Sequence, residues 1–265
     1  MLEKMIFGRF LPGDSFVHKL DPRSKLSFVV LFVIAVFIAN NTITYGLLLG
    51  FSLFVIFVSR IRLYFIINGL KPILFLILFT LLMHLFLTKE GTLLVDWKII
   101  KIYEEGLRQG IYISVRFLVL VLITSVLTLT TSPISITDGM EDLLNPLKRF
   151  KLPVHELALM MSISLRFIPT LMDETDKILK AQLARGSDIS TGSVKERIRA
   201  VIPLLVPLFV SAFKRAEELA VAMEVRGYRG GEGRTRYRQL KWGWRDTVAI
   251  ALLAVLVCAL YLLRG

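Results

Sequence analysis

Four long stretches of this chain contain no Asp, Glu, Lys or Arg, and this feature restricts its fold more than any other. They are residues 26–59, 72–88, 117–137 and 247–263. A helix needs about 17 to 25 consecutive apolar residues to cross the hydrocarbon core of a bilayer, and the first stretch is long enough for two such helices joined by a turn. A hydrophobic content of 55% also favours a membrane protein over an ordinary soluble domain.

These stretches predict an all-α integral membrane protein with about five transmembrane helices. The uncharged sequence ANNT at 39–42 marks the turn within the first stretch. The predicted spans are 24–39, 43–59, 70–87, 108–130 and 247–263.

The orientation of the spans is predicted from the basic residues, because loops rich in Lys and Arg stay on the cytoplasmic side. The loop 89–106 mixes both signs of charge, whereas two other segments are basic. Basic residues lie in the first segment of the chain, up to the start of the first span, and in the loop after the second span: Lys4, Arg9, Lys19, Arg23, Lys25, Arg60, Arg62 and Lys71. We therefore expect a cytoplasmic N-terminus and a C-terminus on the other side. The net charge of +12 follows from the same rule, so nucleic acid is not an expected partner.

The chain divides into three predicted parts: the N-terminal segment with four spans at 1–131, a cytoplasmic region at 132–246, and the last span at 247–265. The cytoplasmic region opens with a short amphipathic helix, for which Thr137 is the predicted N-cap and Pro146 the end.

Two longer helices follow in the cytoplasmic region. The first is uncharged from Leu157 to Leu165 and amphipathic after Pro169, and the second is uncharged from Ala200 to Phe213 and charged beyond it. The uncharged part of the second helix is too short to cross a bilayer. We therefore predict two long crossed helices that lie in the cytoplasm or at the membrane interface.

Both long helices end in an Arg-Gly pair. The sequences are AQLARGSD at 181–188 and AMEVRGYRGG at 222–231. Gly after a helix adopts the left-handed conformation at low cost, and Arg in the last turn suits the negative end of the helix dipole, so ordinary C-caps explain each pair. Two such pairs on two matched helices also indicate a second interpretation. Each would present an exposed guanidinium that an acidic groove on a partner protein could bind through two parallel hydrogen bonds.

The chain lacks the motifs of common enzymes. It has no G-x-x-x-x-G-K-[ST] phosphate loop and no G-x-S-x-G sequence. Its three histidines, His18, His84 and His155, have no metal-ligand spacing, and the single Cys258 allows no internal disulfide. We therefore expect a chain that is not an enzyme and has no cofactor or metal of its own.

Three features have two readings that the sequence leaves open. The sequence GLLLG at 46–50 favours close helix packing, either within the fold or against another membrane subunit. Arg116 lies inside the fourth predicted span, where a charge is costly unless it is paired or reaches the interface, and its role is structural or functional. DPRSK at 21–25 likewise has a functional and a structural reading, since Asp21 as N-cap and Pro22 at the first helical position explain the sequence without any function.

Four stretches together resemble one family, the transmembrane T components of energy-coupling factor transporters. They are PGDSFVHKLDPRSKL at 12–26, LRFIPTLMDE at 165–174, AQLARGSD at 181–188 and AMEVRGY at 222–228. They occur in the expected order and are spread over most of the chain.

The resemblance implies a coupling subunit in a prokaryotic cytoplasmic membrane. Two ABC-type ATPase subunits, which bind the ATP, would dock on the X-R-G motifs, and a membrane-embedded S component would bind the vitamin or metal to be imported. The docking residues that match are Ala184, Arg185, Gly186, Val225, Arg226 and Gly227, with Val225 in place of the commoner Ala. The resemblance also makes Arg166, Pro169, Pro203 and Pro207 coupling or hinge residues, although prolines bend helices without any role in motion as well.

Two rival classes remain. A stand-alone permease would need its own substrate site within the spans, which offer few polar groups beyond His84 and Arg116. A structural membrane anchor would not account for two matched Arg-Gly ends.

Overall fold

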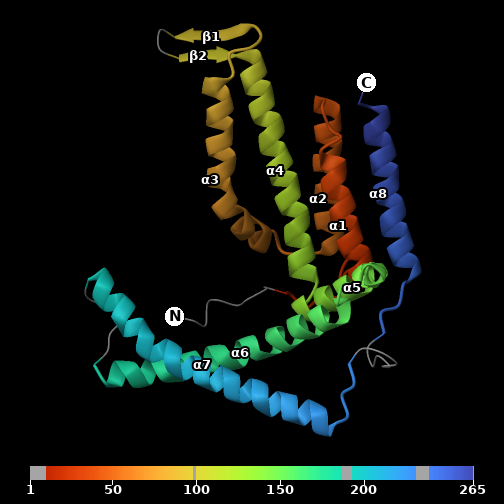
Figure 1. Cartoon of the computed structure of the whole chain (residues 1–265). Coiled ribbons are helices and arrows are strands. Elements are labelled where there is room, and N and C mark those ends of the chain that lie inside the picture. The colour runs from red at the N-terminus through yellow and green to blue at the C-terminus, as the bar shows by residue number, and fades with distance from the viewer. Residues whose placement is uncertain (1–9, 98–99, 187–192, 231–238, 265) are drawn as a thin grey trace. The chain divides into compact units, whose positions relative to one another are not determined.

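The computed structural model describes residues 10–97, 100–186, 193–230 and 239–264, and the chain forms two compact units (Figure 1). The bundle unit contains Gly8–Leu143 and Leu240–Gly265, and the crossed-helix unit contains Leu144–Gln239. The three-part division predicted from the sequence follows membrane topology rather than compactness, and it stays a prediction.

The bundle unit is made of helices that alternate in direction along the chain (Figure 1). Its helices are α1 Pro22–Val36, α2 Thr42–Ser59, α3 Leu63–Leu87, α4 Glu104–Thr130, the short α5 Pro133–Leu144, and α8 Trp244–Leu262. α3 continues through Pro72 and bends in its first part, as expected where a proline removes a helical hydrogen bond.

A β-hairpin joins α3 to α4, within the region predicted from the sequence as a loop. Its strands are β1 Leu93–Trp97 and β2 Ile100–Tyr103, and they pair antiparallel with Leu93 opposite Tyr103. The hairpin is the small β element of an otherwise helical fold, and it projects from one end of the bundle unit (Figure 1).

Two glycines allow α3 and α4 to pack closely. A Cβ atom on Gly106 would lie 2.9 Å from the carbonyl oxygen of His84, and one on Gly110 would lie 3.4 Å from that of Leu81. Small residues at a helix interface let backbones approach, and this is a main source of helix association in lipid. The GLLLG sequence at 46–50 is different: both of its glycines are exposed, and no described atom lies within 4 Å of a Cβ added to either. Its face on α2 is therefore not used for packing within the described chain.

The core of the bundle unit lies between α1, α2, α4 and α8. Its fully buried apolar side chains include Phe32, Leu48, Val119 and Leu260. Phe28, Phe32 and Phe51 form a stacked group with ring centroids 6.0 to 6.2 Å apart.

A buried polar cluster fastens the start of α1 to α8 and to the end of α4. Asp246 accepts hydrogen bonds from the backbone N–H of Asp21 at 2.8 Å and from Ser24 Oγ at 2.5 Å. Lys25 Nζ donates to the carbonyl oxygen of Thr130 at 3.0 Å and so caps the end of α4. Asp21 also accepts from the N–H of Arg23, which confirms it as the predicted N-cap.

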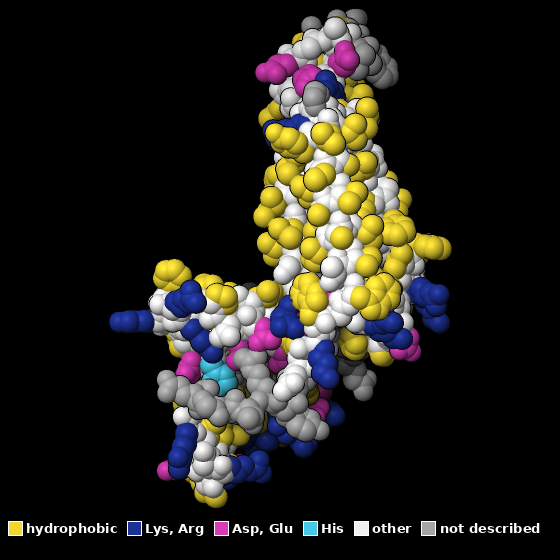
Figure 2. All heavy atoms as spheres, turned by 90° about the vertical axis from the view of Figure 1, so that its right-hand side faces the viewer, with side chains coloured by type: hydrophobic (Ala, Val, Ile, Leu, Met, Phe, Trp, Pro, Cys, Tyr) yellow, Lys and Arg dark blue, Asp and Glu magenta, His cyan; other side chains and the backbone are white. Residues whose placement is uncertain are grey.

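Five helices in the described part of the chain are long and apolar enough to cross a membrane: α2, α3, α4, α6 (Val154–Ala184) and α8. Four of them coincide with predicted spans. The other predicted span, 24–39, corresponds to α1, whose 15 residues are about 22 Å long and thus shorter than the hydrocarbon core. On the face seen in Figure 2, hydrophobic side chains form a band over the bundle unit, and charged side chains gather at its two ends.

The crossed-helix unit begins with a 3-10 helix, Asn145–Phe150, followed by α6 and by α7 (Val194–Val225). The two long helices pack against each other and cross, so that their C-terminal ends point to opposite sides of the pair (Figure 1). The prediction of two long crossed helices is confirmed.

Candidate partner-docking site

The first Arg-Gly pair ends α6. The backbone N–H of Arg185 donates to the carbonyl oxygen of Gln182 at 3.1 Å, and that of Gly186 donates to Leu183 at 3.0 Å. Gly186 has a φ of +83°, in the left-handed region that favours glycine. The chain therefore leaves the helix axis directly after Arg185.

The second Arg-Gly pair ends α7 with a complete Schellman motif. The N–H of Gly227 donates to the carbonyl oxygen of Glu224 at 2.8 Å, and that of Tyr228 donates to Met223 at 3.0 Å. Gly227 has a φ of +71°. These are the two hydrogen bonds that define the motif, and they satisfy carbonyl groups that the end of a helix leaves free.

Both helix ends are open to solvent. All six residues of the two triplets are exposed, and the side chain of Val225 is 82% exposed. A Cβ atom added to Gly186 or Gly227 would meet nothing within 4 Å. The glycines are therefore required by backbone conformation rather than by crowding within the chain, and a partner surface could come close to the backbone at both ends.

A polar clamp holds α6 and α7 together where they pack. Glu174 of α6 accepts hydrogen bonds from Ser211 Oγ at 2.5 Å and from Arg215 Nε at 3.2 Å, both on α7. Ser211 and Arg215 are four residues apart and so lie on one face of α7. Sequence reasoning missed this clamp, whose one local signal is the spacing of Ser211 and Arg215 in a mostly apolar helix.

The predicted hinge residues lie within the two long helices and away from their ends. Pro169 is inside α6, and Pro203 and Pro207 are inside α7. Arg166 is exposed on α6, one turn before Pro169. The structure thus groups the predicted residues into two helix ends and two proline-containing segments, and their roles stay predictions.

One face of α7 is apolar and exposed. Ile202, Val206, Phe209, Val210 and Phe213 recur at helical spacing, and each is more than half exposed. A shallow groove on this face is lined by four of these residues together with Lys214 and Glu217. Contiguous apolar patches of this kind on a protein surface mark sites of interaction with proteins or membranes.

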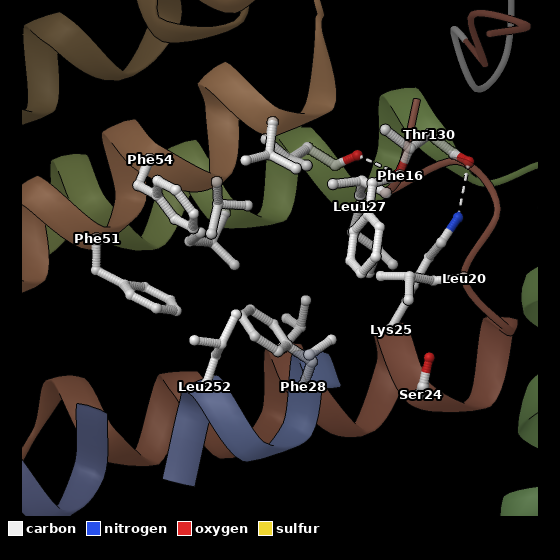
Figure 3. Close-up of a pocket in the computed structure, with 17 residues that line it drawn as sticks. Phe16, Leu20, Ser24, Lys25, Phe28, Phe51, Phe54, Leu127, Thr130 and Leu252 are labelled. Atoms are coloured by element: carbon white, nitrogen blue, oxygen red, sulfur yellow. Dashed lines mark hydrogen bonds between the residues drawn. The ribbon is translucent and has the colours of Figure 1, made fainter. Parts of the chain in front are cut away.

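The bundle unit contains an apolar cavity of about 250 Å³ between α1, α2, α4 and α8 (Figure 3). Phe28, Phe51, Phe54 and Leu252 are among the side chains around it. The polar groups at its edge are already bonded, because Lys25 Nζ donates to Thr130 and Ser24 Oγ bonds Asp246. The cavity therefore offers no free hydrogen-bonding group to a polar substrate.

Metal ligands do not cluster in the described residues, where no group of three or more His, Cys, Asp or Glu side chains could hold an ion. Together, the fold and the two open helix ends define a class: a helical multi-pass membrane protein that carries an exposed pair of crossed helices.

Comparison with known proteins identifies the family. Residues 13–237 match the family CbiQ, described as cobalt transport protein. The chain is 62% identical over 265 residues, the full length of both proteins, to the energy-coupling factor transporter transmembrane protein EcfT of Bacillus subtilis (strain 168). It is 58% identical over 263 residues to the EcfT protein of Macrococcus caseolyticus, covering 99% of both. The match to that of Listeria innocua is 55% over 265 residues and the full length of both. The chain belongs to this family of energy-coupling factor transporter transmembrane components.

Proposed function

We propose that this chain is the coupling subunit of an energy-coupling factor importer. In this proposal it passes the ATP-driven motion of two ABC-type ATPase subunits to a membrane S subunit that binds a vitamin or metal. The observation that carries the proposal is the pair of helices α6 and α7, each ending in an exposed Arg-Gly with the glycine in the left-handed conformation. The chain itself would be non-catalytic, and the ATP would be bound by its partners.

The ATPase subunits would bind at the two helix ends. Arg185 and Arg226 would each offer a planar fork of donors to acidic groups on a partner, and the adjacent glycines would admit its surface. Because the C-terminal ends of α6 and α7 point to opposite sides of the pair, each could engage a separate subunit. Motion of the two subunits relative to each other would then change the angle between the helices.

The apolar face of α7 is the surface that we propose for the S subunit. Its exposed residues, among them Val206, Phe209 and Phe213, would be covered by a membrane protein that presents an apolar surface of its own. A change in the crossing angle of α6 and α7 would tilt or release that subunit. Pro169, Pro203 and Pro207 would be the places where the helices bend, with Arg166 next to the first of them.

The basic end of the bundle unit is proposed to face the cytoplasm. Basic side chains at the starts of α1 and α8 and between α2 and α3 lie at that end: Lys19, Arg23, Arg60, Arg62 and Arg245. Basic loops remain cytoplasmic during insertion. In the sequence, the crossed-helix unit is inserted between α5 and α8.

The test is co-purification of the full chain with candidate ATPase subunits. Wild type is compared with the double variant Arg185→Glu/Arg226→Glu and with a matched control, Lys180→Glu/Lys214→Glu, which reverses two exposed cations on the same helices. Truncating one partner of a buried charge pair costs about 2 to 5 kcal/mol, so reversal at both helix ends should abolish binding.

We expect the wild type and the lysine control to retain the ATPase subunits and the arginine variant to lose them while it is still inserted and folded. Equal retention by the arginine variant and the wild type would refute docking at these ends. Failure of the wild type to retain any subunit would do the same.

A stand-alone permease is the second candidate function. It would need a polar substrate site in the bundle unit, yet the cavity of Figure 3 is lined by hydrocarbon and its polar edge groups are already bonded. The geometry therefore supports the coupling subunit better. Uptake by the chain alone, reconstituted in vesicles without any partner, would reverse this choice.

A further inference from the structure

Arg116 lies near the middle of α4, in a segment long and apolar enough to cross the membrane. An arginine keeps its charge under all ordinary conditions, and a charge inside a membrane segment is expensive and usually functional. The contacts of this guanidinium therefore show whether its charge and its N–H donors have partners.

Among the described residues, the guanidinium of Arg116 has aromatic partners and no acidic one. Its Nη2 donates to the phenol oxygen of Tyr45 at 2.5 Å, and its central carbon lies 5.3 Å from the ring centre of Phe37 and 5.8 Å from that of Tyr45. Its Nε is buried and has no hydrogen-bond partner among the described residues. No carboxylate in the described part of the chain lies within ion-pair distance of it. One positive charge and at least one buried donor thus remain unmatched.

A second arginine and a second tyrosine extend the same face of α4. Arg108, Tyr112 and Arg116 are spaced four residues apart, which places them in one row on the helix. Arg108 Nε donates to the phenol oxygen of Tyr112 at 3.2 Å, and the rings of Tyr112 and Tyr45 stack with centroids 4.7 Å apart. In the part of the chain that the structure describes, the acid paired with this row is Glu105, whose Oε2 lies 3.8 Å from Arg108 Nη1 at a solvent-accessible position. We call Arg108, Tyr112, Arg116 and Tyr45 the arginine row.

The position of the arginine row in a bilayer follows from the ends of α1 and α2 that it contacts. Tyr45 is in the first turn of α2, and Phe37 directly follows the last residue of α1, so the row faces the turn between these helices. The 18 residues of α2 are about 27 Å long, close to the roughly 30 Å hydrocarbon core, so its first turn falls at the core boundary if the helix spans the membrane. Arginine side chains near such a boundary extend toward the headgroups.

We propose that the arginine row binds the phosphate of a phospholipid in the leaflet from which the β1–β2 hairpin projects. The terminal nitrogens of the Arg116 guanidinium would donate two parallel hydrogen bonds to one phosphate. Because the oxygen of Tyr45 accepts from Arg116, its own proton is free to be donated to the same anion. Arg108 would add the second positive charge. This site is separate from the coupling function proposed above.

Lipid binding by the full-length protein in detergent tests this site by native mass spectrometry. The probes are dioleoyl phosphatidylglycerol, dioleoylglycerol, which has the same chains without a phosphate, and inorganic phosphate. The variants are Arg116→Gln, Arg116→Lys, which keeps the charge but loses the fork, and Tyr45→Phe, which keeps the ring but loses the free proton. Arg245→Gln is the matched control, since Arg245 is an arginine at the other end of the bundle that lies over the ring of Trp244.

We expect the wild type and the Arg245 control to bind phosphatidylglycerol at least tenfold more tightly than dioleoylglycerol. Arg116→Gln should lose this preference, and the other two variants should reduce it. Thermal unfolding identifies any variant that misfolds, and Tyr45→Phe keeps the test valid if Arg116→Gln does not fold.

Four results would overturn the proposal. Equal binding of the two lipids by the wild type would show that the acyl chains alone determine the affinity. Saturation by millimolar inorganic phosphate, without any preference between the lipids, would assign the row to a free anion. If folded Arg116 and Tyr45 variants kept the preference, or if Arg116→Gln instead lost a co-purifying membrane partner, the anion would come from elsewhere or from a protein carboxylate.

Discussion

The bundle unit and the crossed-helix unit both contain many apolar side chains, but they differ in how many of these side chains they bury. The bundle unit buries its largest apolar side chains, such as Phe32, Leu48 and Leu260, together with a satisfied polar cluster. Among the side chains described in the crossed-helix unit, only Val154 and Ala158 are buried. The bundle has a buried core of its own, whereas the crossed helices leave an apolar face exposed. Hydrophobic side chains thus form a buried core in one unit and an exposed face in the other.

The largest expected effect tests the self-sufficiency of the bundle unit. Asp246→Ala removes the acceptor of the N–H groups of Asp21 and Gly243 and of the Ser24 hydroxyl. Each buried group left without a partner costs about 1 to 3 kcal/mol, so we expect a loss of about 3 to 5 kcal/mol and a clearly lower unfolding temperature in detergent. Asp14→Ala is the control, because Asp14 is exposed and its ion pair with Lys19 is long, at 4.0 Å. Similar unfolding temperatures for both variants would contradict the assignment of the cluster as a structural fastener.

Two glycines give the next comparison. In Gly106→Ala, the added Cβ would lie 2.9 Å from the carbonyl oxygen of His84 and would push α3 from α4, at a cost of about 1 to 3 kcal/mol. Gly46→Ala adds the same atom where nothing lies within 4 Å, and it should be neutral or stabilise α2 by about 0.5 to 1 kcal/mol. Thermal unfolding of both variants measures the difference. A loss of stability in Gly46→Ala without any partner present would contradict the open face of α2.

The clamp of the crossed-helix unit should contribute less to stability than the polar cluster of the bundle. Glu174→Ala removes the acceptor of Ser211 and Arg215, whose ion pair is partly exposed, so we expect a loss of about 1 kcal/mol or less. Its effect should appear instead in the angle between α6 and α7, measured as a broader distance distribution between spin labels on the two helices. Lys177→Ala, on the same helix, should leave that distribution unchanged. An unchanged distribution in Glu174→Ala would show that apolar packing alone sets the angle.

The smallest effect concerns pH and the segment before α1. Burial is the largest influence on His18 and lowers its pKa, and nearby Lys25 lowers it further, against opposing contributions from the carbonyl of Leu11 and from Asp14. In the neutral form, Nε2 donates to Leu11 at 3.0 Å and Nδ1 accepts from Ser15 at 2.6 Å. A lowered pKa means that the unfolded chain binds the proton first. Stability is therefore full above the unfolded pKa of about 6.5 and falls as the pH drops below it. His18→Gln should remove this dependence of stability on pH, as measured by the unfolding temperature between pH 5 and 8.

The sequence predicted well the features that depend on residues next to each other in the chain. Asp21 before Pro22, and Gly186 and Gly227 after their helices, act through their own backbone neighbourhood, so spacing alone revealed them. Thr137 shows the limit of the same reasoning. α5 begins earlier, at Pro133, and Ser132 Oγ accepts from the N–H of Ser135, so the predicted N-cap lies inside the helix. Two residues suited to cap one helix compete, and the earlier serine comes just before a proline.

Contacts between distant segments were beyond reach of the sequence. Asp246 and Asp21 are separated by most of the chain, and Glu174 meets Ser211 and Arg215 only because α6 and α7 cross. The hydrophobic stretches predicted the helices, but they did not separate a helix buried by its own chain from one that leaves its apolar side exposed. α6 is long and apolar enough to cross a membrane, yet it belongs to the exposed pair.

The clamp at Glu174 lies at unequal distances from the C-terminal ends of the two crossed helices. At 1.5 Å per residue, the segment from Ser211 to the end of α7 at Val225 is about 21 Å long, and that from Glu174 to the end of α6 at Ala184 is about 15 Å. One rotation about the clamp therefore moves the end of α7 farther than the end of α6. Two partners held at these ends would share a single angle but travel different distances.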